Sequence, residues 1–431
     1  MPDIIQLLPD ALANQIAAGE VIQRPSSVVK ELLENAVDAS ANFIKLIIKD
    51  SGKTLIQVID NGSGMTETDA RMAFERHATS KIRKTEDLFK IQTKGFRGEA
   101  LASIAAVAKV ELKTRTSHSS LGVLMKIENS EVIKQEPCSM STGSNFSVKQ
   151  LFFNVPARRK FLKSDPVELK HILDEFVKVA LAHPDIGFSC FHNDNNLYQL
   201  EAGTLRQRII GLFNKSINDK LIPVEETTDI IQVNGFIGKP EFSKKSKGNQ
   251  FFFVNNRFIK SPYLSHAVRF AFEQLLPDKA YPFFVLFIDI NPEDVDINVH
   301  PTKQEVKFEN ERLIYNYIKV SVRHALGKYS ITPVLDFDHN VNFNIAQQTP
   351  QSEGSVNQSF GGSPDQRKGQ RASKSEINAW NSEFEELMSP GGTTQEDAVI
   401  LASKINSTDG EESLAHEIQQ KAPLQLSLIH I

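Results

Sequence analysis

The sequence contains 431 residues, a length that predicts two to four domains with cores of their own. Lys and Arg number 49 against 53 Asp and Glu, and the formal net charge of -4 excludes a chain that is basic throughout, so any DNA-binding surface has to be local. Two cysteines, Cys138 and Cys190, exclude a disulfide framework and a cysteine-rich zinc site. The longest apolar run, near residues 283–288, is too short to cross a membrane, and the first residues of the sequence do not show a basic segment followed by an apolar run. We therefore expect a cytoplasmic protein without a membrane span.

The first part of the chain mixes helix and strand. Apolar residues recur at helical spacing behind possible caps, which predicts an amphipathic helix over residues 27–39. Two strand-like runs, 43–49 and 54–60, follow it and are separated by the turn residues 50–52, the pattern of a hairpin.

A turn and a second helix come next. Residues 60–64 have turn chemistry, and helix-forming sequence continues from there through His77. Further on, a glycine-bearing loop at 95–101 runs directly into an apolar helix at 100–108. Backbone N–H groups at such a helix start can bind phosphates, although the loop alone fits an ordinary helix entry equally well.

The later part of the ordered sequence predicts a βαβ-like unit. Strands are expected near 230–237, 250–254 and 282–290, and helices near 263–276 and 309–327.

Composition predicts where the ordered chain ends. From residue 346 to 375 the only large apolar residues are Val356 and Phe360, which cannot offset the entropy of ordering the segment. The expected organisation is listed in chain order: a first domain at 1–203, a second at 204–332, a flexible low-complexity linker at 333–421, and the start of a further domain at 422–431.

Polar residues share one face of the helix predicted at 27–39. Glu31 and Asn35 lie four residues apart, and Asp38 follows one turn later on the same side. A carboxylate beside a carboxamide suits a water-activating base next to an oxygen ligand for Mg²⁺. Taken alone, this spacing more often marks a solvated polar face.

Asp60 ends an apolar strand and leads into Gly62 and Gly64, which allow a ligand to approach the backbone closely. A carboxylate in this place can accept a hydrogen bond from an exocyclic amine such as that of adenine. An ordinary Asx-turn explains the same residues equally well.

Three segments, residues 31–39, 60–65 and 95–101, resemble in order and spacing the three nucleotide-binding motifs of the GHKL ATPases. Longer phrases resemble the MutL mismatch-repair family within that superfamily. These phrases occupy residues 8–21, 76–81, 152–161 and 299–303. The resemblance covers residues 1 to about 330 and implies an α+β fold: a GHKL (Bergerat) ATP-binding α/β sandwich, a ribosomal-S5-like βαβ domain, and then a disordered linker.

The resemblance implies roles for single residues. Glu31 resembles the general base, Asn35 the Mg²⁺ ligand and Asp60 the residue that reads adenine, while Lys303 resembles a lysine that reaches the γ-phosphate from the second domain. The other residues that it places around ATP are Asp38, Gly62, Gly64, Met65, Thr79, Ser80, Lys81, Gly95, Phe96, Arg97, Gly98, Glu99, Ala100, Leu101 and Ser144. The loop 93–101 resembles a lid over the triphosphate. Ser144 departs from the family, which usually has threonine there.

Basic residues concentrate in the second domain. Residues 206–328 contain 18 Lys and Arg against 14 Asp and Glu. The candidate contacts to DNA phosphates, without sequence preference, are Lys239, Lys244, Lys245, Lys247, Arg257, Lys260 and Arg269. A solvated basic loop is an equally good interpretation, and Pro262 stands where the family often has a basic residue. Basic residues at 158–160 could contribute or support the lid.

The resemblance also implies a function. A bacterial MutL-type ATPase binds ATP with Mg²⁺, dimerises through its N-terminal part, closes as a clamp on DNA, and couples a MutS-type mismatch recognition protein to a downstream helicase or endonuclease. Residues 1–20 are apolar and by composition only loosely anchored, and they resemble an arm that crosses to the partner of the homodimer. Residues 422–431 resemble the start of a C-terminal dimerisation domain. Endonuclease activity is not assignable to this chain. The alternatives are a topoisomerase-like or chaperone-like GHKL ATPase, and a nucleotide-switched scaffold with negligible turnover.

Overall fold

The structure is a computed structural model that describes residues 8–81, 94–95, 98–246, 248–273, 275–277, 279–296 and 306–330. All of these lie within one compact unit, residues 1–340. The segments expected as linker and as the start of a further domain, 333–421 and 422–431, fall outside the described residues.

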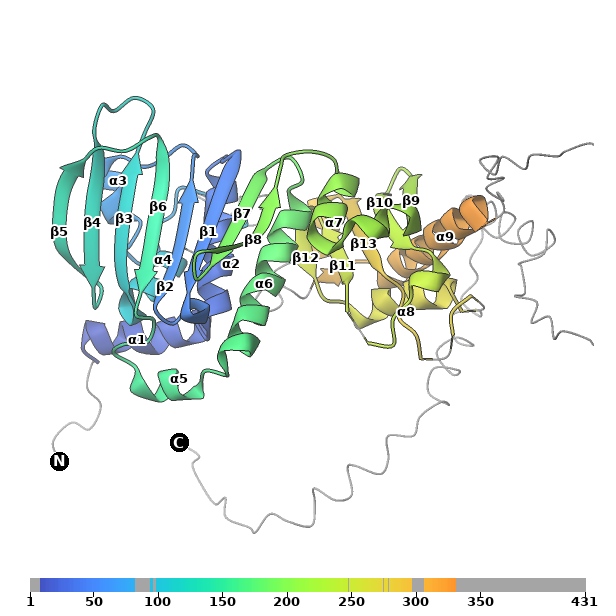
Figure 1. Cartoon of the computed structure of the whole chain (residues 1–431), viewed down its shortest axis with the longest axis horizontal. Helices are drawn as coiled ribbons and strands as arrows, with labels where there is room; N and C mark the ends of the chain where they lie inside the picture. Colours follow the sequence, from blue (N-terminus) through green and yellow to red (C-terminus); the bar gives the residue numbers. More distant parts are fainter. Residues whose placement is uncertain are drawn as a thin grey trace, which may run out of the picture. The chain divides into compact units, whose positions relative to one another are not determined.

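An eight-stranded sheet forms the first half of the described chain, with β5 at one edge and β8 at the other (Figure 1). Its strand order is β5-β4-β3-β6-β2-β1-β7-β8, and β1 and β7 form the parallel pair in an otherwise antiparallel sheet. The strands are β1 Phe43–Lys49, β2 Leu55–Asp60, β3 Lys109–Arg115, β4 Gly122–Glu128, β5 Glu131–Cys138, β6 Gly143–Lys149, β7 Gly187–His192 and β8 Asn195–Leu200.

Helices cover one face of this sheet. Every second residue of β1 is buried, namely Ile44, Leu46 and Ile48, and these side chains join a core with Leu32 and Leu33 of α2. Strand alternation thus gives one covered and one more polar face. The helices of this half are α1 Asp10–Val21, α2 Pro25–Asp38, the short η1 Asp50–Gly52, α3 Glu67–Met72, α4 Ala100–Val107, α5 Pro156–Phe161 and α6 Asp165–Ala182.

A five-stranded sheet in the order β12-β11-β13-β10-β9 forms the second half. Its β11 and β13 are parallel and are separated in the chain by β12 and α8, which gives the expected βαβ connection. The elements are α7 Leu205–Phe213, η3 Lys215–Lys220, β9 Leu221–Thr227, β10 Ile231–Gly238, η4 Pro240–Phe242, β11 Gln250–Val254, β12 Arg257–Ile259, α8 Pro262–Ala271, β13 Phe284–Ile290, η5 Pro292–Asp294, β14 Val295–Asp296, β15 Lys307–Phe308 and α9 Glu311–Ser330. Helices α8 and α9 pack with this sheet in a second core.

Arg208 ties the two halves together at the start of α7. Its side chain is 2% exposed, and burial lowers its pKa to about 10, so it stays charged at neutral pH. The guanidinium donates to five backbone carbonyls, those of Ala180 at 2.8 Å, His183 at 3.3 Å, Pro184 at 3.0 Å, Ile186 at 2.5 Å and Glu201 at 3.1 Å. These carbonyls end α6 and flank β7 and β8, so one side chain satisfies several loop acceptors.

The expected elements at 27–39, 43–49, 54–60 and 250–254 are confirmed within one or two residues, as α2, β1, β2 and β11. The expected boundary at residue 203 lies in the turn between β8 and α7.

Three expectations differ from the structure. The helix expected near 263–276 ends at Ala271, where the Phe272 N–H donates to the Arg269 carbonyl three residues back. The helix expected through His77 ends at Met72, after which the N–H groups of Phe74 and Glu75 donate to carbonyls three residues back. His77 has a positive φ of 62°, and its N–H donates to the Gly98 carbonyl. The segment expected to be loosely anchored, residues 1–20, contains α1, whose Ala18 is fully buried in the core. The small side chain of Ala18 allows α1 to pack closely against the core.

Candidate functional site

Three neighbouring strands bring three polar side chains into one row. Asp60 at the end of β2 lies opposite Ser144 of β6, and Ser144 lies opposite Thr114 of β3. All three are buried, at 7%, 5% and 0% exposure. Sheet register therefore brings into one polar row three residues that lie up to 84 positions apart in the sequence.

Asp60 is held for hydrogen bonding rather than for an ion pair. Its carboxylate accepts from the Gly62 N–H at 2.9 Å. Burial raises its pKa to about 6, and backbone N–H groups of Gly62 and Ser144 partly offset this rise. At neutral pH the group is ionised and acts as an acceptor, which suits the exocyclic amine of a purine.

Two glycines after Asp60 sit where no side chain fits. Gly64 has a φ of +65°, and a Cβ there would lie 2.0 Å from the carbonyl oxygen of Arg115. At Gly62 a Cβ would lie 2.6 Å from the carbonyl oxygen of Ala39, the residue that follows α2. The glycines therefore let the turn after β2 pack directly on β3 and on the end of α2.

Thr114 organises this end of the site, and it was not among the residues predicted from the sequence. Its hydroxyl accepts from the Met65 N–H at 2.9 Å, donates to the Gly143 carbonyl at 3.1 Å, and lies 3.1 Å from the Ser144 hydroxyl. Both lone pairs and the proton are thus used. The alternating pattern of residues 109–115 would have identified the strand, but not these partners.

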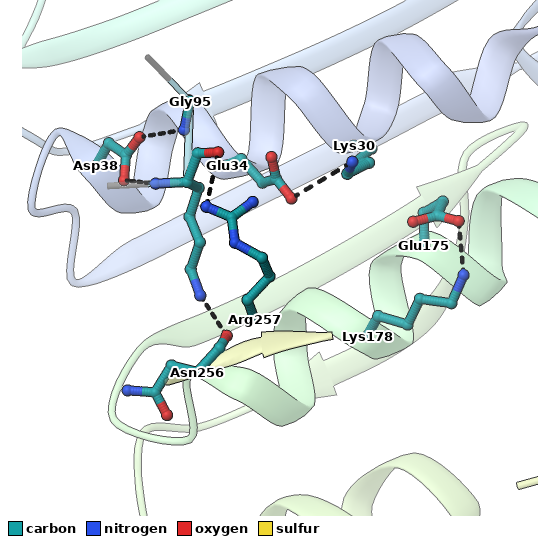
Figure 2. A network of polar contacts seen from close by, with 9 residues as sticks. Lys30, Glu34, Asp38, Gly95, Glu175, Lys178, Asn256 and Arg257 are labelled. Carbon is teal, nitrogen blue, oxygen red and sulfur yellow. Dashed lines mark hydrogen bonds and ion pairs between the residues drawn. The ribbon is translucent and has the colours of Figure 1, made fainter. Parts of the chain in front are cut away.

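Asp38 gathers the second cluster, at the end of α2. Its carboxylate forms an ion pair with Lys81 at 2.5 Å, and it accepts from the backbone N–H of Lys94 at 3.1 Å and of Gly95 at 3.3 Å. Lys81 also donates to the amide oxygen of Asn35 at 3.3 Å. Figure 2 shows Asp38 and Gly95 side by side at this point. The structure therefore brings together Asn35, Asp38, Lys81 and Gly95.

The donor set on α2 suits a hard cation. Glu31 lies one turn before Asn35 on the same side of α2, and both are half-buried. The Asn35 oxygen accepts one hydrogen bond, from Lys81, and an amide oxygen has a second lone pair. Mg²⁺ in phosphate sites takes one or two protein oxygens and completes its shell with phosphate and water. Asn35 therefore fits such an ion.

The third motif, residues 95–101, contacts the segment at 76–81 through Gly98 and Glu99. Gly98 has a φ of +63°, and a Cβ there would lie 2.4 Å from the Ala78 carbonyl oxygen. Glu99 precedes α4, and its carboxylate oxygen Oε1 lies 3.6 Å from the ring nitrogen Nδ1 of His77. Ala100 and Leu101 form the first turn of α4, whose backbone N–H groups can bind an anion.

Other predicted residues are less connected or fall outside the described chain. Thr79 accepts from the Lys81 N–H at 3.2 Å, and Ser80 is exposed beside it. Phe96, Arg97 and Lys303 lie outside the described residues, so their predicted places in the site are not seen.

The basic residues of the second sheet divide into exposed and buried ones. Lys244, Lys245, Lys260 and Arg269 are exposed, and Lys239 is half-buried. Lys239 to Lys245 surround η4, whereas Lys260 precedes α8 and Arg269 lies in the last turn of that helix rather than near its start. They therefore come from two places on the second half. Lys247 is outside the described residues.

Arg257 does not offer its charge to the surface as the DNA interpretation requires. Its side chain is 7% exposed, and the guanidinium donates to the backbone carbonyl of Lys94 at 3.2 Å. A buried guanidinium that faces the first half of the chain suits a contact within the protein better than a phosphate contact.

Two family profiles match the two halves of the described chain. A profile of the histidine kinase-, DNA gyrase B- and HSP90-like ATPases matches residues 23–148, and one described as the C-terminal domain of DNA mismatch repair protein matches residues 209–327. The first match confirms the predicted GHKL fold.

Among relatives, the DNA mismatch repair protein MutL of Christiangramia forsetii is 59% identical over 340 residues, which are 79% of this chain and 55% of that protein. The MutL of Flavobacterium johnsoniae is 59% identical over 342 residues, 79% of this chain and 53% of that protein. The chain thus spans about half the length of these relatives.

A solved structure, the N-terminal domain of a DNA repair protein, matches with a TM-score of 0.63 at 26% identity, and the match covers 72% of this chain and 96% of that one. Within the described part of the chain, no helix combines the length and apolarity that a membrane span needs.

Proposed function

The chain belongs to the MutL family of DNA mismatch repair proteins and carries a GHKL ATPase domain, and from this premise we propose that it binds ATP with Mg²⁺ at the end of α2 and hydrolyses it. The observation that carries the proposal is the buried row of Asp60, Ser144 and Thr114, which adjoins the carboxylate-rich end of α2 through the close approach of Gly62 to Ala39. The row of Asp60, Ser144 and Thr114 would then bind the adenine base, and the charged end of α2 would bind the phosphates of the same nucleotide.

The adenine end of the site consists of strand residues. Asp60 accepts a hydrogen bond from the exocyclic amine, while Gly62 and Gly64 let the turn after β2 pack directly on Ala39 and Arg115 and so hold this end of the site in shape. Guanine presents a carbonyl oxygen at the corresponding position, and two acceptors repel each other there. The site should therefore select ATP over GTP.

The phosphate end consists of charged groups. Glu31 takes the proton of the attacking water, and Asn35 holds Mg²⁺, which when bound neutralises charge on the phosphates. Lys81 supplies a second positive charge, which Asp38 keeps in place at 2.5 Å. The N-terminus of α4 offers backbone N–H groups to the phosphate oxygens.

Beyond hydrolysis, we propose that ATP drives dimerisation of this part of the protein and clamp closure on DNA. Lys303 senses the γ-phosphate, and the exposed lysines around η4 and Lys260 contact DNA without reading its sequence. A MutS-type protein and a downstream helicase or endonuclease are the proposed partners.

The test is Glu31→Ala in the full chain. General-base assistance contributes about 10²–10⁴ to a rate, so the variant should hydrolyse ATP at least about 100-fold more slowly while still binding it. Glu75→Ala, at an exposed position after α3, is the matched control and should keep the parental rate.

A parental rate in Glu31→Ala would remove Glu31 as the base. ATP binding without turnover by the parent protein would instead support the nucleotide-switched scaffold. Steady-state phosphate release together with ATP titration separates these outcomes.

A further inference from the structure

The backbone at Lys94 and Gly95 is tied down from both sides. On one side, both N–H groups donate to the Asp38 carboxylate, at 3.1 and 3.3 Å. Hydrogen bonds to a charged group are about twice as strong as neutral ones, so this contact fixes two successive peptide groups against the end of α2. Figure 2 shows the first-half residues Asp38 and Gly95 above Asn256 and Arg257 of the second half.

The other side is the tip of the β11–β12 hairpin in the second sheet. Arg257, the first residue of β12, donates to the Lys94 carbonyl at 3.2 Å, and the Lys94 ammonium in turn donates to the Asn256 carbonyl. Lys94 and Arg257 are 9% and 7% exposed. The contact is therefore reciprocal. It is also shielded from water, and hydrogen bonds of charged groups are stronger in such a buried place than in water.

The same contact continues to the proposed Mg²⁺ ligand. Asp38 holds Lys81 at 2.5 Å, and Lys81 donates to the Asn35 amide oxygen at 3.3 Å. Four polar contacts therefore connect the hairpin tip of the second sheet to Asn35. Each of them joins groups on different elements, so displacement of the hairpin changes the geometry at the helix end.

We propose that Arg257 is a positioning residue for ATP: from the second sheet, it holds the Lys94–Gly95 backbone against Asp38, so that the phosphate end of the site takes its binding geometry only while the two halves are docked at this hairpin. The proposal rests on the proposed function and extends it. Arg257 thereby acts within the protein rather than on DNA.

The proposal has a kinetic signature. Without Arg257, the binding-competent arrangement of Lys94 and Gly95 is only fractionally populated in the free protein. The apparent affinity falls by that fraction, whereas the complex, once formed, is unchanged. KM for ATP should therefore rise while kcat stays nearly constant.

The experiment compares Arg257→Met, Arg257→Lys and the exposed control Arg312→Met in the full chain. Arg257→Met should raise KM for ATP about tenfold and leave kcat within about threefold. Arg257→Lys keeps a positive donor and should restore KM to within about threefold of the parent. Arg312→Met should match the parent.

A second variant tests the route of the effect. If Arg257 acts through Asp38, then Arg257→Met should add less than about twofold to KM in an Asp38→Asn background, because residues in one network are not additive. A full tenfold increase in that background would show that Arg257 acts by another path, and would overturn the proposal.

Hydrogen exchange makes the inference testable apart from catalysis. In the ligand-free protein, the amides of Lys94 and Gly95 should exchange at least about tenfold faster in Arg257→Met than in Arg312→Met. Unchanged exchange together with unchanged KM would overturn the inference. Absence of ATP binding by the parent would overturn the proposed function, yet faster exchange in Arg257→Met would still support the positioning contact.

Discussion

The two ends of the candidate site are held in different ways. At the adenine end, neighbouring strands fix Asp60, Ser144 and Thr114, and the hydrogen bonds around them involve backbone groups and hydroxyls. At the phosphate end, Asn35, Asp38 and Lys81 are held by each other's charges and by the backbone at 94–95. A sheet cannot shift one strand without breaking its ladder, whereas contacts between side chains are not bound to such a ladder.

This difference suggests a division of labour. The proposed adenine end is built from strands of the first sheet, and its described hydrogen bonds join residues of the first half only. The proposed phosphate end is connected to the second sheet through Lys94 and Arg257, and we expect it to respond to the position of that sheet. Mutations at the adenine end should accordingly change both nucleotide affinity and selectivity, and mutations at the phosphate end should change affinity alone.

The largest effect is expected at the adenine end, from Asp60→Asn. Because the Gly62 N–H requires an oxygen acceptor, the amide nitrogen of the new side chain would face the base and meet the exocyclic amine as a second donor. ATP affinity should fall about 100-fold and ATP should lose its advantage over GTP. Competition binding of the two nucleotides measures both, with the exposed Asp194→Asn as control.

A smaller effect, about 30-fold, is expected at the phosphate end from Lys81→Met. The Asp38 side chain is 8% exposed and would lie next to the phosphates without its cation. ATP and GTP should lose affinity equally, since the base is not contacted here.

Lys53→Met is the matched control for Lys81→Met. Lys53 pairs with Asp165 at the same 2.5 Å distance, but the two side chains are 32% and 59% exposed. Exposed pairs contribute little, so nucleotide affinity should change less than twofold. Equal losses in both variants would contradict the role assigned to burial.

Acidic pH should act on the adenine end, by about tenfold between pH 7 and pH 5. Burial raises the pKa of Asp60 to about 6, so below this pH the carboxyl is protonated and ATP has to displace the proton. ATP affinity should fall in the parent relative to Asp60→Asn, which lacks the group and controls for titration of the nucleotide itself.

The contribution of Asp60 to the stability of the ligand-free protein should change in the opposite direction: it should increase as the pH falls. The folded pKa of about 6 exceeds the ordinary value of 3.8, so the folded state binds more protons than the unfolded state between about pH 4 and 6. The contribution of Asp60 to the free energy of unfolding therefore decreases as pH rises through this window, by an amount on the order of 2 kcal/mol. Denaturant titrations of the parent and of Asp60→Asn at the two ends of this pH window test whether the contribution decreases as pH rises.

The smallest effect is expected from Ser144→Thr, which introduces the residue usual in the family. The hydroxyl that contacts Thr114 at 3.1 Å is retained, and one methyl group is added at a 5% exposed position. ATP affinity should change less than twofold. A tenfold loss would show that the row of Asp60, Ser144 and Thr114 is packed too tightly for the family residue.

Local sequence patterns predicted the parts of the site that depend on one element. The helix that carries Glu31, Asn35 and Asp38 follows from apolar spacing, and Asp60 at a strand end follows from the glycines behind it. Both are confirmed as elements, while the chemical roles of these residues stay predictions.

The contacts between elements were not predictable in the same way. Thr114 reaches Asp60 only through β6, and strand order in a sheet depends on long-range pairing that spacing does not encode. Arg257 was grouped with surface lysines by its charge, because burial between two halves of the chain leaves no local pattern. The polar network of Lys94 was missed for the same reason.

Arg208 has a mechanical consequence for the joint between the two halves. A chain segment can serve as a hinge only if its backbone torsions can change without loss of contacts, and here a single rigid guanidinium would release up to five carbonyls at once. The turn from β8 into α7 is therefore stiff. Arg208 joins α7 to the end of α6, and α6 packs against α2, so we expect a movement of α7 to reach the helix that carries Glu31 through Arg208 as well as through the side-chain contacts of Asp38.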